Sequence, residues 1–138
     1  NAGYQAMVLG SLSMNISNNS IALGDLSTTT VSTATTTVTV STDAATGYFM
    51  SIQTAGANPL IAVSDGEVTA GQEEYGIAVV GSDAVTTTDR GIVGGLPLAQ
   101  KLISGTGVND LVFKAAISPT TASGAKSQSI SIAVSANF

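Results

Sequence analysis

The chain has 138 residues, the size of one domain, and only 9% of them are charged. Its net charge is −5 with four basic residues in all, which excludes the clustered cations of a nucleic-acid-binding surface. It contains no His and no Cys, which removes the usual general base, the thiol nucleophile and most transition-metal ligands. The composition therefore predicts a protein that is not an enzyme, with no catalytic residue, no metal site and no cofactor.

The N-terminal segment is uncharged and ends in a continuous apolar run at residues 6–9. A continuous apolar run is typical of a strand that is covered on both faces. One hypothesis is that residues 1–10 leave their own domain and complete the β-sheet of a neighbouring subunit. The partner-binding residues of this donor strand would be Tyr4, Ala6, Met7, Val8 and Leu9. The alternative is an ordinary first strand that packs within its own sandwich.

Residues 11–138 show the period-two alternation of half-buried strands. In residues 11–17, three apolar side chains alternate with polar ones. Residues 28–42 are rich in Thr and Val, which favour strands, but their apolar positions change parity, so we expect a bulge or break near Ser32 and Thr33. Residues 43–47 end in Gly and precede a third alternating run at residues 48–53, which predicts a hairpin.

The middle of the chain, residues 54–110, carries many Gly residues and weaker signals. Short apolar runs predict strands at residues 60–63, 75–80 and 92–93. Residues 98–103 follow a Pro and precede a Gly, which favours one or two helical turns.

The C-terminal part predicts a strand at residues 111–117, an outgoing loop at residues 118–126 and a last strand at residues 127–138. The last strand has the clearest alternation in the chain. Its apolar face comprises Ile130, Ile132, Val134, Ala136 and Phe138. In total the sequence predicts an all-β fold, a single jelly-roll or β-sandwich domain of about eight short antiparallel strands with an N-terminal strand extension.

Two features concern the surface and the cellular location. The triplets that begin at Asn15 and Asn18 match the N-glycosylation pattern, so both are candidate glycosylation sites. The chain begins at Asn1 and has no apolar run of about 18 residues. We therefore expect a mature secreted chain at the cell surface, with no membrane insertion.

Four stretches resemble secreted bacterial and archaeal surface proteins. They are residues 23–42 (beginning LGDLS), 43–48 (DAATGY), 114–118 (KAAIS) and 129–138 (SISIAVSANF). The chain is similar in these to the TasA and camelysin filament subunits and to archaeal bundling pilins, and more distantly to WxL wall domains, whose signature Trp it lacks. The resemblance to TasA implies a jelly-roll subunit whose N-terminal strand enters the next subunit, and only residues 2–9 match that strand in position and character.

The favoured hypothesis is a structural subunit of an extracellular, pilus-like filament that polymerises by donor-strand complementation. Its main partner is then a second copy of itself, with other cells or surface glycans as further partners. The alternative is a monomeric cell-wall or glycan-binding adhesion module.

Overall fold

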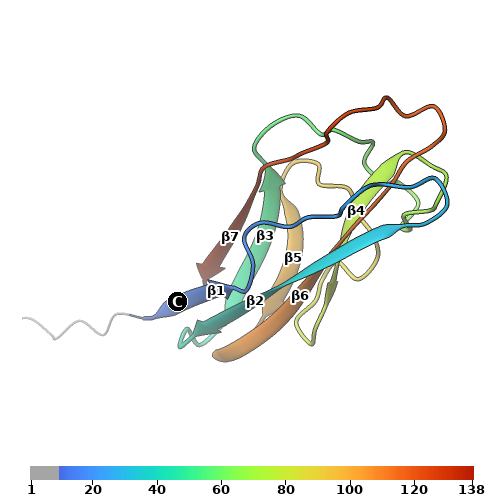
Figure 1. The fold of residues 1–138 in the computed structure, drawn as a ribbon. Coiled ribbons are helices and arrows are strands. Elements are labelled where there is room, and N and C mark those ends of the chain that lie inside the picture. Colours follow the sequence, from blue (N-terminus) through green and yellow to red (C-terminus); the bar gives the residue numbers. More distant parts are fainter. Residues whose placement is uncertain (1–9) are drawn as a thin grey trace, which may run out of the picture.

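The computed structural model describes residues 10–138, which form seven strands and no helix. The strands are β1 (Leu12–Ile16), β2 (Ser32–Thr42), β3 (Tyr48–Thr54), β4 (Glu74–Val80), β5 (Leu96–Lys101), β6 (Gly105–Ala116) and β7 (Ile130–Ala136). Sheet A has the order β1-β2-β6-β4 and sheet B the order β5-β3-β7, and every pair within them is antiparallel. Figure 1 shows the two sheets as facing layers, so the fold is all-β and sandwich-like, as the sequence predicts.

The core lies between the inner faces of the sheets, where alternate residues of each strand are buried. On β2 and β3 these are the residues that alternation predicts. The largest completely buried side chains are Tyr48, Met50, Ile52, Ile77, Ile92, Leu98 and Leu111. Thr and Ser occupy the outward positions of β2, where short hydroxyl side chains, most of them the β-branched Thr, fit a pleated surface that faces water.

The predicted break near Ser32 is confirmed, because β2 begins at that residue and Val31 precedes it. The predicted hairpin at residues 43–47 is wrong. β2 belongs to sheet A and β3 to sheet B, so these residues cross from one layer to the other. Ala44 is buried within the crossing, and Gly47 has a φ of 79°, which favours Gly. Each of the two strands has one apolar face. Two packed layers bury both faces against each other, whereas a single hairpin would leave them exposed.

The predicted helical turns at residues 98–103 are also wrong, because β5 occupies residues 96–101. Pro97 pairs with Ser51 where the register between β3 and β5 shifts, and an irregularity of this kind accommodates a residue that lacks an N–H group. The strand predicted at residues 111–117 begins earlier, at Gly105. The runs at residues 60–63 and 92–93 form loops, with a single bridge from Ala62, whereas the run at 75–80 lies in β4.

The two ends of the sandwich differ in their connections. At the end that we call the near end lie Gly10, the crossing at residues 43–47 and Phe138, because β1 begins there and β7 ends there. At the opposite, far end lie the long loops 17–31, 55–73 and 117–129. The strands β1 and β7 border the same side of the sandwich and run in opposite directions along it (Figure 1).

Candidate functional site

The side of the sandwich between β4 and β5 is closed by one segment, residues 83–90. At the edge of β5, the Gln100 N–H donates to the carbonyl of Asp83 at 2.9 Å. The Val85 N–H donates to the carbonyl of Leu98 at 2.8 Å. Two outer backbone groups of β5, the Leu98 carbonyl and the Gln100 N–H, are therefore paired within the chain.

The same segment then covers the outer edge of β4. Ile77 and Arg90 exchange both backbone hydrogen bonds, at 2.8 and 2.9 Å. The Val79 N–H donates to the carbonyl of Thr86 at 2.8 Å. Covering an edge in this way is how natural sheets prevent pairing with another chain.

The opposite side, between β1 and β7, is open. Two hydrogen bonds fix which backbone groups of β7 face its partner β3: Asn137 N–H to Gly47 carbonyl and Ala55 N–H to Ser129 carbonyl, both at 2.9 Å. Since bonded and non-bonded pairs alternate in an antiparallel ladder, the odd-numbered residues of β7 face β3. The even-numbered residues turn their N–H and C=O groups to the free edge, and these are Ile130, Ile132, Val134 and Ala136.

The outer edge of β1 is free in the same way. The Ser17 N–H donates to the Thr37 carbonyl at 2.9 Å, and the Asp43 N–H donates to the Ser11 carbonyl at 3.4 Å. The odd-numbered residues of β1 therefore face β2. Within residues 10–138, no backbone pairing reaches the outer edge of either β1 or β7. On the β4–β5 side, in contrast, residues 83–90 pair with both edge strands.

Apolar side chains accompany the two free edges. Leu12 and Met14 lie on the core-facing side of sheet A, yet they are 39% and 41% exposed. Sheet A has four strands and sheet B has three, and the edge strand β7 comes close to β1 without burying these two side chains. On β7 the core-facing residues are half-buried, although their neighbours on β3 are buried.

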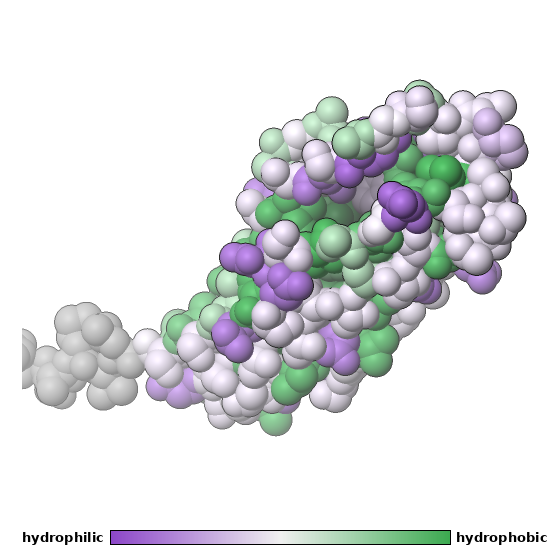
Figure 2. Space-filling model, viewed as in Figure 1, coloured by the Kyte–Doolittle hydropathy of each residue, from purple (hydrophilic) through white to green (hydrophobic). Residues whose placement is uncertain are grey.

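The open side deepens toward the far end into a cavity of about 1110 Å³. It lies between loop 17–31, next to sheet A, and loop 117–129, which leads into β7. Figure 2 shows this face of the molecule hollowed, with apolar surface inside the hollow and polar surface at its rim. The apolar side chains that line it include Ile21, Leu60, Tyr75, Phe113 and Ile130.

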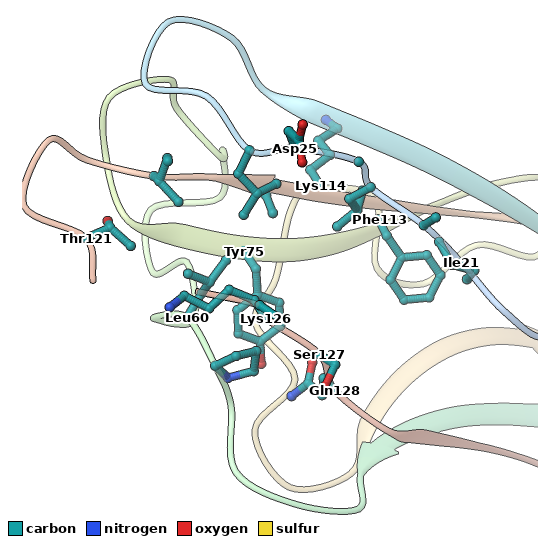
Figure 3. A pocket seen from close by; sticks show the side chains of 18 of the residues that line it. Ile21, Asp25, Leu60, Tyr75, Phe113, Lys114, Thr121, Lys126, Ser127 and Gln128 are labelled. Carbon is teal, nitrogen blue, oxygen red and sulfur yellow. The ribbon is translucent and has the colours of Figure 1, made fainter. Parts of the chain in front are cut away.

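The walls of this cavity come from segments far apart in the sequence (Figure 3). Phe113 and Ile21 lie on the side of sheet A, and Leu60 and Gln128 lie across the cavity from them. Tyr75 forms part of the floor, where its hydroxyl accepts a hydrogen bond from the Ile92 N–H at 3.1 Å. Asp25, Lys114 and Lys126 also line the cavity, and Lys114 Nζ lies 3.1 Å from Asp89 Oδ1.

A buried polar network lies at the near end, away from the cavity. The Tyr48 hydroxyl donates to Asp83 Oδ2 at 2.7 Å and accepts from Asn109 Nδ2 at 3.0 Å. Lys101 Nζ lies 3.6 Å from Asp83 Oδ1. Burial raises the pKa of Tyr48 to about 12, and Asp83 contributes in the same direction. Because Tyr48 belongs to sheet B and Asn109 to sheet A, the network joins the two layers.

The two candidate glycosylation sites lie at the surface. Asn15 is on the outward face of β1, and Asn18 is in the bend that follows, with its side-chain Oδ1 accepting from the Ser20 N–H at 2.9 Å. Both side chains are accessible to modification. The five residues of the predicted donor strand, Tyr4, Ala6, Met7, Val8 and Leu9, lie outside the described residues.

The free edges are the features of this site that sequence reasoning missed. The alternation in residues 11–17 and 127–138 predicted both strands correctly but does not say whether a strand lies inside a sheet or at its edge. The signal that identifies an edge is the pairing of the other strands, which is not local in the sequence.

No family model matches the chain, and no curated protein matches it significantly. Within residues 10–138 there is no helix of the length and apolarity needed to span a membrane. The same residues contain no group of three or more Asp and Glu side chains arranged to hold a metal ion.

Proposed function

We propose that this protein is a structural subunit of an extracellular, pilus-like filament that polymerises by donor-strand complementation. The N-terminal segment, residues 1–10, is the donor, and the sandwich of residues 11–138 is the acceptor. The observation that carries the proposal is the unequal treatment of the two sides of the sandwich. Residues 83–90 cover the edges on one side, whereas the other side leaves two edges free beside exposed core-facing side chains.

The donor strand would complete the strand count. Sheet B has three strands and sheet A has four, so one strand beside β7 gives four in each sheet. A total of eight strands in two sheets is the number found in a jelly roll. In this proposal the jelly-roll fold is complete only in the polymer.

The energetics require both the side chains and the backbone of the donor. Burying three or four apolar donor side chains contributes about 5–9 kcal/mol. Ordering about eight residues costs at least that much in backbone entropy. Each edge hydrogen bond adds about 0.5–1.5 kcal/mol, and β7 offers free N–H and C=O groups at every second residue. Binding of the donor strand therefore needs the hydrogen bonds of the free β7 edge as well as the burial of its side chains.

The composition of the chain is compatible with dense packing of subunits outside the cell. Only 9% of the residues are charged, and Ser and Thr occupy the outward positions of β2. Short hydroxyl side chains permit close lateral contact, whereas long charged side chains keep molecules apart. The proposed location is the cell surface after secretion, with the chain itself as its main partner and other cells or surface glycans as secondary partners.

The test compares the full-length protein with a variant that lacks residues 1–9, by negative-stain electron microscopy and light scattering. We expect fibres from the full-length protein and monomers from the truncated one. A full-length variant with Ala6→Asp and Val8→Asp is the control for loss of chain length, and it also stays monomeric because charges cannot be buried unpaired. Fibres from the truncated protein would contradict the proposal. A full-length protein that stays monomeric at high concentration and binds isolated cell-wall glycan favours the adhesion module instead.

A further inference from the structure

The direction of the chain at the open side restricts how a donor strand can enter. β1 starts at the near end and runs toward the far end, since Leu12 pairs with Thr42 at the near end and Ile16 pairs with Val38 further along. β7 runs the opposite way and finishes at the near end, where Ala136 pairs with Tyr48. Any chain that precedes Gly10 along the line of β1 leaves the molecule at its near end.

We propose that residues 2–9 of a second copy enter the open side from its far end and pair antiparallel with the free edge of β7. This inference rests on the proposed function and adds to it the acceptor edge, the strand direction and the register. It also predicts that subunits follow one another head to tail, with the near end of one against the far end of the next.

The direction follows from repeating one contact along a filament. A head-to-tail interface that does not close into a ring generates an open filament, in which successive copies keep the same polarity. The next copy then presents its far end to the near end from which the donor strand leaves. A donor that continues the line of β1 has the direction of β1, and it is therefore antiparallel to β7 of the next copy.

The same direction disfavours the other free edge. Beside β1 of the next copy the donor would be parallel to its neighbour, whereas every strand pair in both sheets is antiparallel. Parallel pairing is slightly less stable per residue. The donor thus extends sheet B to the order β5-β3-β7-donor and covers the exposed Leu12 and Met14 of sheet A.

The register follows from the length of β7 and the orientation of its backbone. The free N–H and C=O groups belong to the even-numbered residues from Ile130 to Ala136, whose side chains also face the core. Directly opposite residues in an antiparallel pair point to the same face. If residues 2–8 span all of β7, Val8 lies opposite Ile130 at the cavity and Ala2 lies opposite Ala136.

This arrangement leaves only Leu9, Gly10 and Ser11 between the residues paired with β7 and the start of their own β1 at Leu12, so consecutive subunits must touch. The exposed large side chains at the two ends agree with such a contact. Leu102, Ile103 and Phe138 at the near end are 68%, 64% and 74% exposed. At the far end, Ile61 is 62% exposed and Val93 is 74% exposed. Apolar groups at both ends are what a head-to-tail contact would bury.

The chain has no Cys, so pairs of engineered Cys residues report strand direction without background. Two full-length variants carry matched pairs, Val8→Cys with Ile130→Cys and Ala2→Cys with Ala136→Cys. The mispaired control is Ala2→Cys with Ile130→Cys, whose Cα atoms would lie about 20 Å apart if the strand is antiparallel. Opposed residues in a ladder have Cα separations near 5.5 Å, within the range that a disulfide bridges.

After mild oxidation of assembled protein, we expect a covalent ladder on a non-reducing denaturing gel from both matched variants and loss of the ladder in the mispaired one. A ladder from the mispaired variant alone means that the donor strand is parallel to β7, which overturns the inference. The proposed function would then still be supported, because the N-terminal segment would still pair with a neighbouring subunit. Fibres without a ladder from any variant also overturn the inference, because the donor then lies elsewhere. A disulfide confined to monomers places the segment in its own chain and overturns both the inference and the proposed function, as does full-length protein that never assembles.

Discussion

Met14 and Val40 are direct partners across β1 and β2 and lie on the same face of sheet A, yet Val40 is completely buried and Met14 is 41% exposed. The difference arises from the opposite layer. Sheet B has one strand fewer than sheet A, and its edge strand β7 comes close to β1 without burying Met14. The exposure of Met14 thus shows that sheet B leaves the edge strand of sheet A partly uncovered.

The first prediction separates assembly from stability at this position. Met14→Lys should abolish fibres, because the incoming strand would have to bury a charge, while the melting temperature of the monomer changes little. Val108→Lys is the matched control, since Val108 is 55% exposed on the outward face of β6. It should leave both properties unchanged. If Met14→Lys still forms fibres of normal length by electron microscopy, the donor does not cover β1.

Strand positions and core residues were largely predictable from the sequence, because alternation is a local signal. β3 and β7 have the faces that the pattern of Tyr48–Gln53 and residues 127–138 predicts. The pattern failed where long-range pairing decides the outcome. The turn at residues 43–47 is equally suited to a hairpin and to a crossing between layers, and only the partners of β2 and β3 distinguish the two.

The open side of the sandwich was not predictable for the same reason. The outer edge of β7 is free because no described segment pairs with it, whereas residues 83–90 cover the edges on the other side. Similarly, Gly105 and Gly107 suggest a loop from their composition, but they pair with Thr42 and Val40 inside a long strand. Hydrogen bonding to β2, which is far away in the sequence, therefore places these two glycines in a strand despite their low intrinsic strand propensity.

A second prediction concerns the free backbone groups of β7. Val134→Pro removes an N–H that points to the free edge, so the monomer should fold and the fibres should be lost. Val134→Ala controls for the altered side chain and should retain some assembly. Ala133→Pro removes an N–H that points to β3 and should lower the free energy of unfolding by about 1–3 kcal/mol, measured by urea denaturation. Fibres from Val134→Pro equal to those of the unchanged protein would show that this edge is not used.

A third prediction uses the raised pKa of Tyr48. Its pKa is about 12 in the folded protein against 10.0 ordinarily, so the folded state holds this proton more tightly than the unfolded state. The resulting stability is fully present below pH 10 and is lost as the pH rises through 12, by about 1.4 kcal/mol per pH unit in between. Ultraviolet titration checks this, because the unchanged protein should show a tyrosine transition near pH 12 that the Tyr48→Phe variant lacks. A protein whose tyrosines all titrate near pH 10 contradicts the prediction.

The last prediction concerns Gly107, which lies against the same polar network. A Cβ atom at this position would collide with the Tyr48 hydroxyl and with Asp83 Oδ2. These two atoms form a 2.7 Å hydrogen bond in the buried junction between the layers, so neither can move without losing its partner. Gly107→Ala should therefore lower the free energy of unfolding by about 1–3 kcal/mol, from overpacking and a broken hydrogen bond. Gly95→Ala is the matched control, because a Cβ atom there meets nothing within 4 Å. Urea denaturation of both variants measures the difference, and equal stabilities would mean that the network tolerates displacement.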